Sequence, residues 1–320
     1  MKILVTGGAG FIGSAVTKKL LERGDSVVCV DSFNDYYSPK VKEDNVAQFA
    51  ANPNYKLYRG DITDYELLKN IFATEKFDRV FHPAARAGVR PSIADPFIYA
   101  DTNYIGTLNL LELSKDFGIE NFVLTSSSSV YGENKKVPFA ETDNVDFPIS
   151  PYAATKKATE LMAHAYHYLH KLNVNVIRPF TVYGPGGRPD MFPFLCTKWI
   201  DEGMEVKRFG DGSTRRDYTY IDDIVDGVIA AIDRIFGYEI FNLGNSDTID
   251  LNSFIAVVEK CLGKKANIKQ YPMFSGDVPI TYADITKARK MLDYDPKTKI
   301  EDGMANFVAW YNENKHLYQD

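Results

Sequence analysis

A tyrosine and a lysine stand four residues apart in the middle of the chain, at Tyr152 and Lys156. On a helix this spacing places both side chains on one face. Ser150 and Pro151 precede them directly, and a serine N-cap followed by proline is typical of a helix start. A nearby ammonium group favours phenolate and lowers the pKa of a tyrosine, which is ordinarily near 10. The pair therefore predicts a general base, although such pairs are also common on solvated helices.

Four consecutive serines, 126–129, follow the apolar run Phe122–Thr125. The run predicts a buried strand, so the serines would stand at the carboxyl edge of a sheet, where ligands bind in open α/β folds. A hydroxyl group at this edge could hydrogen-bond a reacting hydroxyl beside Tyr152. Because Val130-Tyr131-Gly132 follows directly, we interpret the stretch as part of an active site and not as a serine-rich loop.

A glycine-rich segment near the start of the chain has the spacing of a dinucleotide-binding turn. Gly8, Gly10 and Gly13 fit G-x-G-x-x-G, and Gly7, Gly10 and Gly13 fit a wider spacing. The strand-like run Lys2–Thr6 precedes the turn and a helical pattern follows it, which is the context the motif requires. Glycine lets the backbone bend tightly and approach a pyrophosphate, whose charge then lies on free N–H groups at the helix start.

Three further features agree with a dinucleotide site. Asp31 ends the next apolar run, where a carboxylate can bind both ribose hydroxyls of NAD and would repel the additional phosphate of NADP. Asp61 follows the third strand-like run and could either contact the adenine amino group or N-cap the helix expected at 65–72. Ala84 and Ala85 follow the fourth run, and such small residues suit a cofactor pressed against the backbone. We predict an NAD site.

The elements that must position these residues alternate between strand-like and helical patterns up to about residue 177. The strand-like runs are Lys2–Thr6, Ser26–Val30, Lys56–Arg59, Arg79–His82, Phe122–Thr125 and Asn175–Arg178. Alternation of this kind predicts an α/β fold, a Rossmann-type doubly wound parallel sheet. We expect an NAD-binding domain over residues 1–179, with about 215–245 packing back on it. Residues 180–320 would form a smaller α/β substrate-binding domain, with helices near 192–202, 221–236, 251–262, 285–292 and 301–311.

Composition narrows the class of protein. With 320 residues, of which 45% are hydrophobic, the chain can bury a large core and form two lobes. The net charge of −6 provides no basic face for nucleic acid. The three cysteines have neither disulfide-framework nor metal spacing, and the five histidines show no ligand pattern. No apolar run reaches membrane-spanning length. We expect a cytoplasmic protein without a metal site.

Taken in order, these motifs resemble the extended short-chain dehydrogenase/reductase family. Within it they are most similar to the nucleotide-sugar 4-epimerases, above all those that act on UDP-glucuronate. The resemblance covers essentially the whole chain and is carried by Thr6–Gly13, Asp31, Ser126–Gly132, Tyr152 with Lys156, Arg178–Pro185 and Arg216-Asp217-Tyr218. It implies bound NAD and a UDP-sugar substrate.

The resemblance also implies roles for individual residues. Ser127 would be the catalytic hydroxyl beside Tyr152 and Lys156, and Arg216 would bind the diphosphate. Tyr152 would take the proton from the sugar O4 while hydride leaves C4 for the nicotinamide, and the 4-keto intermediate would turn over before hydride returns. The residues expected to bind NAD are Gly7, Gly10, Phe11, Ile12, Gly13, Asp31, Asn34, Asp61, Ile62, Ala84, Ala85, Asn103, Tyr152 and Lys156, with Asn103 beneath the cofactor.

Two serines narrow the reaction. Sugar 4,6-dehydratases of the family carry an Asp-Glu pair before Val-Tyr-Gly, and the nucleotide glucuronate decarboxylases carry a Glu immediately before it. This chain has Ser128 and Ser129 at those positions. Dehydration needs a carboxyl group to move the C5 proton, so we favour epimerisation.

The sugar is predicted from Arg188-Pro189-Asp190-Met191, which resembles the glucuronate-handling members. Arg188 with Thr181, Ser127 and Ser128 could bind a sugar carboxylate, because a guanidinium presents a planar fork matched to it. Arg86 and Pro83 depart from that branch, where Gln and Leu are common. We favour interconversion of UDP-glucuronate and UDP-galacturonate over that of UDP-glucose or UDP-N-acetylglucosamine.

Three assignments leave alternatives open. Arg90 could face the substrate or be solvated, and Asp277 could bind the uridine ribose or be a turn acid before Pro279. A non-catalytic NAD-binding sensor is the alternative to an enzyme, although such relatives usually lose the Tyr–Lys pair. The helices expected at 99–117 and 152–172 carry apolar residues on more than one face, including Leu108, Leu111, Met162 and Leu169. Related epimerases pair these helices, so we expect a homodimer.

Overall fold

A computed structural model describes residues 1–273 and 278–318, and a seven-stranded parallel sheet is its largest element. The strand order is β11-β6-β5-β4-β1-β2-β3. Near-continuous apolar runs form the central strands because helices cover both faces of the sheet. The strands are β1 (Lys2–Thr6), β2 (Ser26–Asp31), β3 (Tyr55–Arg59), β4 (Arg79–His82), β5 (Asn121–Thr125), β6 (Val174–Pro179) and β11 (Tyr238–Leu243). The prediction of a doubly wound parallel sheet is confirmed.

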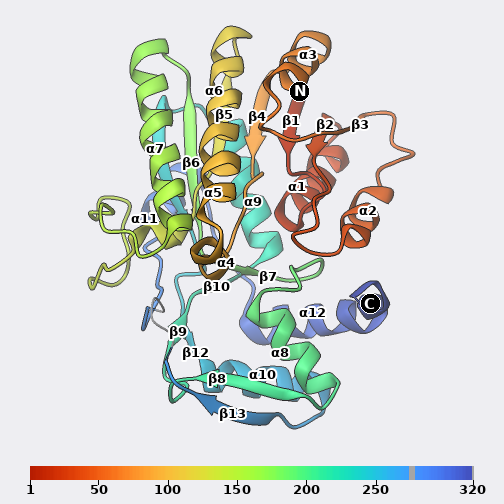
Figure 1. Ribbon diagram of the computed structural model, residues 1–320, viewed down its shortest axis with the longest axis vertical. Coiled ribbons are helices and arrows are strands. Elements are labelled where there is room, and N and C mark those ends of the chain that lie inside the picture. The colour runs from red at the N-terminus through yellow and green to blue at the C-terminus, as the bar shows by residue number, and fades with distance from the viewer. Residues whose placement is uncertain (274–277, 319–320) are drawn as a thin grey trace.

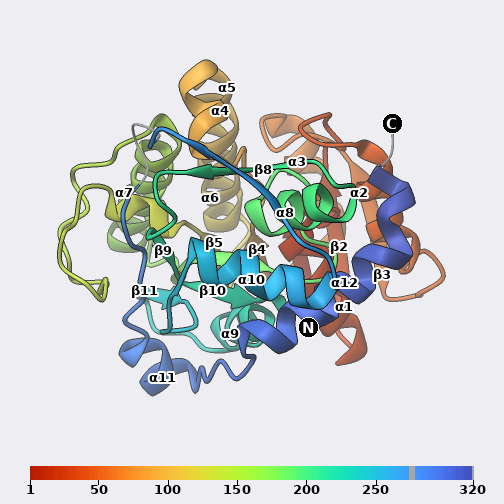
Figure 2. The same ribbon diagram turned by 90° about the horizontal axis from the view of Figure 1, so that it is seen from below.

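Two layers of helices enclose the sheet, as Figures 1 and 2 show from two directions. On one face α1 (Phe11–Glu22) packs beside α9 (Ile221–Asp233). On the other face α6 (Gly106–Asp116) lies between α3 (Tyr65–Glu75) and α7 (Pro151–His170). Helix α2 (Pro39–Ala47) lies beside α1.

The start of α7 follows from local chemistry. The Ser150 hydroxyl accepts a hydrogen bond from the Ala153 N–H at 3.1 Å, and Pro151 takes the first helical position. The N-cap and the proline predicted from the sequence are both confirmed. This helix start sets where Tyr152 and Lys156 stand relative to the sheet.

The chain enters the second lobe after β6 and then returns to the sheet. Strand β11 pairs in parallel with β6, from Tyr238 opposite Val174 to Leu243 opposite Pro179. Helix α9, which precedes β11, packs on β5 and β6. Residues 221–243 are therefore part of the first lobe in space, although they follow part of the second lobe in sequence.

The second lobe lies below the sheet in Figure 1 and consists of short strand pairs and helices. Strand β7 (Thr181–Tyr183) pairs with β10 (Tyr218–Tyr220), β9 (Arg215–Arg216) with β12 (Ile249–Asp250), and β8 (Glu205–Phe209) with β13 (Asn267–Tyr271). The helices are α8 (Phe192–Asp201), α10 (Leu251–Leu262), α11 (Thr286–Leu292) and α12 (Ile300–Asn314). A short 3-10 turn, η3 (Lys315–Tyr318), follows α12.

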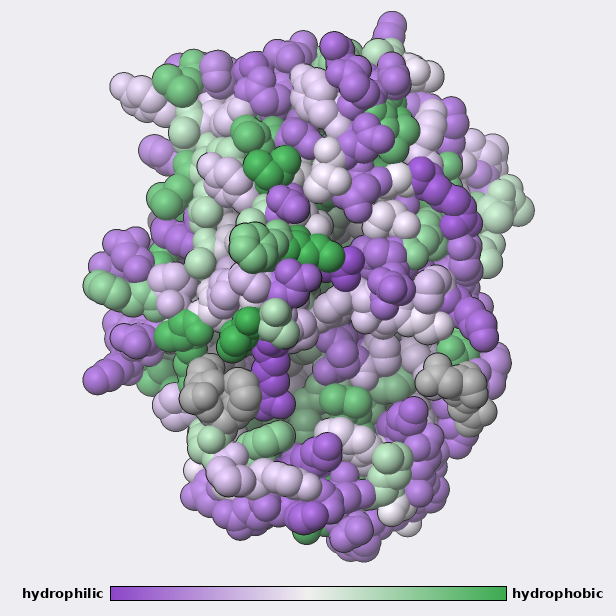
Figure 3. All heavy atoms as spheres, in the orientation of Figure 1, coloured by the Kyte–Doolittle hydropathy of each residue, from purple (hydrophilic) through white to green (hydrophobic). Residues whose placement is uncertain are grey.

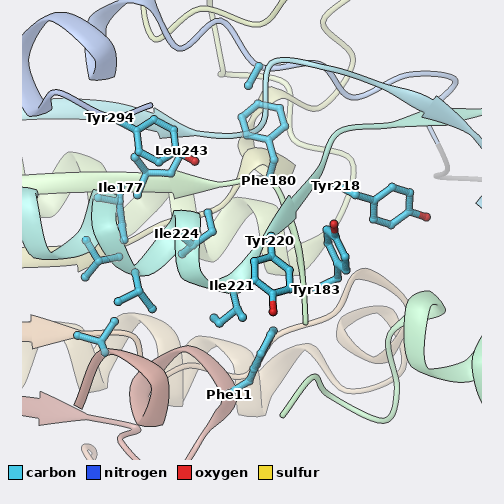
Figure 4. Close-up of a cluster of buried hydrophobic side chains, with 14 of the residues drawn as sticks. Phe11, Ile177, Phe180, Tyr183, Tyr218, Tyr220, Ile221, Ile224, Leu243 and Tyr294 are labelled. Atoms are coloured by element: carbon cyan, nitrogen blue, oxygen red, sulfur yellow. The ribbon is translucent and has the colours of Figure 1, made fainter. Parts of the chain in front are cut away.

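An aromatic cluster joins the two lobes (Figure 4). Phe11 at the start of α1 and Ile221 at the start of α9 lie beside Tyr183 of β7 and Tyr220 of β10. The rings of Tyr183 and Tyr220 are 5.6 Å apart between centroids, and both residues are buried. Because one apolar core runs through this joint, the second lobe is fixed relative to the glycine turn.

One local prediction was confirmed with a difference in helix type, and another was wrong. The helix expected at 99–117 is α5 (Pro96–Tyr99), then a π-helical segment η1 (Ala100–Ile105), then α6. Asp61 does not cap α3, because Asp64 accepts the capping bond from the Leu67 N–H at 3.0 Å. The Asp61 carboxylate instead accepts hydrogen bonds from the N–H and hydroxyl of Thr63.

No helix within residues 1–273 and 278–318 is long and apolar enough to cross a lipid bilayer.

Candidate active site

A cavity of about 410 Å³ opens where β1, β2, β4, β5 and β6 end. The carboxyl edge of a parallel sheet is where ligands of such folds bind. The structure brings most of the predicted site residues to its wall. They are Gly7, Gly10, Phe11, Ile12, Gly13, Asp31, Asn34, Asp61, Ile62, Ala84, Ala85, Ser127, Ser128, Tyr152, Lys156, Thr181 and Arg188.

The glycine turn fits a dinucleotide for a steric reason. A Cβ added to Gly13 would lie 2.2 Å from the Gly7 carbonyl oxygen, and one added to Gly7 would lie 2.9 Å from Ala84 Cα. Gly7 also has a φ of +61°, which L side chains rarely adopt. The N-cap of α1, Gly10, has no side chain to bind the free N–H groups of the first turn. Those N–H groups, with the positive end of the helix dipole, suit a diphosphate.

Asp31 is held in place at the end of β2. It is buried, and its two carboxylate oxygens accept hydrogen bonds from the N–H groups of Ala9 at 3.1 Å and Phe33 at 2.9 Å. The ammonium group of Lys42 lies 3.8 Å away and donates to the backbone and side-chain oxygens of Asn34. Asp31, Asn34 and Lys42 thus form one polar corner that could hold a ribose. These observations support NAD as the ligand of this end.

Tyr152, Ser127 and Lys156 meet at the other end of the cavity. The Ser127 hydroxyl hydrogen-bonds to the Tyr152 phenol and also lies 3.1 Å from the Ser129 hydroxyl. Lys156 is buried, and its ammonium donates to the carbonyl oxygen of Thr125, the last residue of β5, at 2.8 Å. A phenol, a hydroxyl and an ammonium group in one cavity can move a proton to and from a ligand hydroxyl.

The pKa of Tyr152 differs from the sequence-based expectation. Burial raises it above its ordinary value, while the hydrogen bond from Ser127 and the positive charge of Arg188 act in the opposite direction. The sequence predicted that Lys156 lowers the pKa of Tyr152. The net shift is in the other direction, so this prediction was wrong: desolvation disfavours the phenolate more than Ser127 and Arg188 favour it. Burial also lowers the pKa of Lys156 to about 8, against the negative charge of Glu160.

A buried ion pair, Glu160 with Arg178, lies close to Lys156. Arg178 donates to both carboxylate oxygens of Glu160, at 2.8 and 2.7 Å, and both side chains are about 1% exposed. Glu160 also accepts from the Ser126 hydroxyl at 2.5 Å, and Arg178 donates to the Tyr131 hydroxyl at 3.1 Å. This network links the serine stretch to α7 one helical turn after Lys156, so it fixes the end of the cavity that holds Ser127, Tyr152 and Lys156.

Arg188 lines the same cavity as Ser128 and Thr181, and its positive charge acts on the Tyr152 phenol. Its guanidinium lies over the Tyr36 ring, 5.4 Å from the centroid, and donates to Asp190 through Nε and Nη2. The Tyr36 hydroxyl donates to the Ala87 carbonyl oxygen at 2.6 Å. Tyr36 therefore connects the loop after Asp31 to the segment that carries Arg188.

Three predicted residues with described positions do not reach this wall. Asn103 is buried behind it and bonds the backbone N–H and carbonyl of Arg86, at 2.7 and 3.0 Å, so it shapes the wall indirectly. Arg90 is exposed on α4 (Val89–Ala94), with its guanidinium over the Phe209 ring. Arg216 lies in β9 and donates to the Arg215 carbonyl. Asp277 lies outside the described residues.

Sequence reasoning missed Lys42, Tyr36 and the Glu160–Arg178 pair. Lys42 and Tyr36 reach the wall from the segment after β2. Residues 31–37 resemble the glucuronate-handling branch, but the resemblance assigned no role to Tyr36. Glu160 stands four residues after Lys156, on the same face of α7. That spacing was a usable signal, whereas the contact with Arg178 depends on the packing of α7 on β6. No group of three or more potential metal ligands occurs among the residues with described positions.

Comparisons with known proteins agree with this site. The family model described as "NAD dependent epimerase/dehydratase family" matches residues 3–244. A UDP-glucuronate 4-epimerase of Thermodesulfobacterium geofontis is 48% identical over 315 residues, which is 98% of this chain and 97% of that protein. The crystal structure of UDP-glucuronic acid 4-epimerase from Bacillus cereus, in complex with UDP-glucuronic acid and NAD, is 35% identical, with a TM-score of 0.92 and coverage of 98% and 99% of the two chains. The UDP-glucose 4-epimerase of Thermotoga maritima, solved with UDP-glucose, has the same identity, a TM-score of 0.90 and coverage of 98% and 100%. The chain therefore belongs to the NAD-dependent epimerase/dehydratase family.

Proposed function

We propose that this protein is a nucleotide-sugar 4-epimerase that uses bound NAD to interconvert UDP-glucuronate and UDP-galacturonate. One observation carries the proposal: Ser127, Tyr152 and Lys156 share a cavity with the glycine turn and Asp31, and Arg188 stands beside them. The relatives named UDP-glucuronate 4-epimerase support the same reading.

In this proposal each residue of the catalytic end has a defined task. Tyr152 takes the proton from the sugar O4 and later returns it, and Ser127 hydrogen-bonds to the phenol and to O4. Lys156, held by Thr125, lines the same cavity as the phenol and would supply positive charge there. NAD, when bound, would accept a hydride from C4 and give it back to the other face of the 4-keto sugar. The glycine turn, Asp31, Asn34, Asp61, Ile62, Ala84 and Ala85 would hold it.

Epimerisation is favoured over elimination by the chemistry of the wall. Ser128 and Ser129 follow β5, whereas the acidic residues of the described wall, Asp31 and Asp61, lie at the ends of β2 and β3 on the other side of the sheet, and the carboxylate of Asp190 is held by Arg188. A dehydratase needs a carboxyl group near the sugar C5 to move its proton. We propose that hydride returns to C4 and that no water is expelled.

The sugar carboxylate is assigned to Arg188, Thr181, Ser127 and Ser128. A neutral hexose is the second candidate, because the Thermotoga maritima enzyme of nearly the same fold is named for UDP-glucose. We expect turnover with UDP-glucuronate to exceed that with UDP-glucose or UDP-N-acetylglucosamine in a side-by-side assay of purified holoenzyme. If no UDP-sugar is interconverted, the chain is a non-catalytic NAD-binding protein.

The Arg188→Ala variant tests the sugar assignment. We expect its KM for UDP-glucuronate to rise about tenfold or more, since a charge-assisted pair is lost, and its KM for UDP-glucose to change little. Arg23→Ala removes an arginine that pairs with Asp25 and Asp233 instead, and it should change neither value. Equal effects of Arg188→Ala on both substrates would remove the carboxylate pocket from the proposal.

The remaining assignments are proposals of the same kind. Arg216 would contact the diphosphate, and Arg90 would approach the nucleotide from α4. Asn103 would support the wall near NAD through its bonds to Arg86. We further propose that residues 1–179, with about 215–245, act as the NAD-binding unit and residues 180–320 as the sugar-binding unit. Free Cys29, Cys196 and Cys261 suit a reducing compartment such as the cytoplasm.

We also propose a homodimer through helices 99–117 and 152–172. Leu161 and Tyr168 are 59% and 70% exposed and lie seven residues apart, so they share one face of α7. Phe97 of α5 is 81% exposed. Apolar side chains lie on this part of the surface in Figure 3. Leu169 is exposed on α7, as predicted. Leu111 was also predicted to lie on this face, but it is fully buried in the core, so that prediction was wrong.

A further inference from the structure

We propose that Asp190 is a built-in counter-ion of Arg188 that the carboxylate of a hexuronate substrate replaces. By this exchange, Asp190 would set the preference of the pocket between charged and neutral sugars. The inference rests on the proposed function, because it concerns how the same pocket distinguishes its substrates.

Asp190 already occupies one bidentate edge of the arginine. Arg188 donates through Nε to Asp190 Oδ1 at 3.0 Å and through Nη2 to Oδ2 at 2.5 Å. Two parallel bonds of this kind are the strongest arrangement of a guanidinium with a carboxylate. A sugar carboxylate bound at the adjacent edge would therefore put two negative groups on one partly buried cation, where like charges repel.

Exposure identifies which of the two side chains can move. The Arg188 side chain is 20% exposed, whereas that of Asp190 is 36% exposed. Arg188 also lies over the Tyr36 ring, and Tyr36 is fixed through its bond to the Ala87 carbonyl. The Tyr36 hydroxyl contacts Asp190 only at 3.4 Å. Asp190 can thus turn to solvent while Tyr36 keeps the guanidinium at the wall.

A neutral sugar affects the Arg188–Asp190 ion pair differently. It offers no charge to Arg188, and a poorly hydrated guanidinium without a counter-ion is unfavourable. Asp190 supplies that counter-ion, so a neutral hexose could bind without disturbing the pair. Removing the charge of Asp190 should accordingly favour a hexuronate and disfavour a hexose, and both changes shift the preference in one direction.

The Asp190→Asn variant tests this exchange by direct binding. Titration calorimetry on holoenzyme carrying Tyr152→Phe, which should not turn over, gives the Kd of UDP-glucuronate and of UDP-glucose. We expect the ratio of Kd for UDP-glucose to Kd for UDP-glucuronate to rise at least about fivefold when Asp190→Asn is added, the size of effect typical of a half-exposed ion pair. Asp190→Glu keeps the charge and should leave the ratio within about twofold.

Asp233→Asn is a matched control. Asp233 is 39% exposed and pairs with Arg23, which does not belong to the cavity wall, so this variant should leave the ratio unchanged. NAD content and melting temperature establish that each variant is folded. A ratio that falls would mean that Asp190 positions Arg188 for the substrate, and an unchanged ratio would mean that it is a bystander; either result overturns the inference. If the wild-type holoenzyme interconverts no UDP-sugar, the proposed function itself fails, which is a separate result.

Discussion

Tyr152 stands in surroundings that oppose the charge a base must carry. Its pKa is raised by burial, and Ser127 and Arg188 offset only part of that shift. Arg188 therefore offsets part of the cost that burial imposes on the phenolate. Arg188 would then have two effects at once, since it belongs to the sugar end and also favours the phenolate.

Replacement of Tyr152 by phenylalanine removes the proposed proton acceptor and leaves the ring in place. We expect kcat to fall by about 10²-fold or more, because general base catalysis is lost, while the NAD content of the purified protein stays the same. Tyr168→Phe is the control, as Tyr168 is exposed on the same helix, and its kcat should match the wild type. Retained turnover in Tyr152→Phe would remove this residue as the base.

At the scale of elements, the strand–turn–helix at the start of the chain tolerates little change. In Gly13→Ala the new Cβ would meet backbone atoms, the Gly7 oxygen at 2.2 Å and Gly8 Cα at 2.8 Å, which cannot rotate away. We expect loss of NAD binding and a destabilisation of about 1–3 kcal/mol, measured by cofactor titration and denaturant unfolding. Gly24→Ala meets nothing within 4 Å at a φ of +89°, so it should lower stability somewhat and leave NAD binding intact. Normal NAD affinity in Gly13→Ala would contradict the steric account.

The end of β4 makes stability depend on pH. His82 is buried between the hydroxyls of Thr6 and Thr107, at 2.7 and 3.0 Å, and burial lowers its pKa from 6.5 to about 3. In this range the unfolded chain binds the proton more readily than the folded chain. His82 therefore contributes stability above pH 6.5, and this contribution falls as the pH is lowered from 6.5 to 3, by roughly 4 kcal/mol at most.

The His82→Gln variant should remove this contribution to acid destabilisation. Its melting temperature should fall less steeply than that of the wild type between pH 6.5 and 4. His316→Gln, at an exposed histidine of η3, should keep the wild-type slope. An unchanged slope in His82→Gln would show that other groups control acid stability.

Local signals explain which elements were predictable. Ser150 and Pro151 fix the start of α7 by contacts within one turn, and the strands of the first lobe have apolar runs of the right length. The π-helical segment Ala100–Ile105 shares its pattern with an ordinary helix. Asp61 and Asp64 are both plausible caps in sequence, and only the path of the loop decides that Asp64 reaches the Leu67 N–H.

Some residues of the site could be predicted from sequence spacing, and others could not. The glycines, Asp31 and the Tyr152–Lys156 pair carry a spacing that reflects their chemistry. Lys42 and Tyr36 line the cavity from the segment after β2, and Tyr36 is bonded there to the Ala87 carbonyl, 51 residues away in sequence. These contacts arise from tertiary structure, which no short spacing encodes.

At the scale of the whole molecule, the proposed dimer interface is the face formed by helices 99–117 and 152–172. We expect light scattering to give twice the mass of one chain. The double variant Leu161→Glu with Leu169→Glu should shift it to a monomer, because charges would be buried in an apolar contact. Met204→Glu, at a 47% exposed residue of the second lobe, should remain dimeric. A monomeric wild type would refute the interface.

The return of the chain to the sheet has a consequence for biosynthesis. The edge of β6 is covered by β11, which ends at Leu243, and one face of the sheet is covered by α9. A nascent chain that has left the ribosome only to residue 179 lacks both and exposes an open strand edge. The sheet can be completed only after residue 243 has emerged, when β7, α8 and β8 have already been made. The two lobes are therefore completed together during translation. A chain cut after residue 179 would leave the first lobe without α9 and β11.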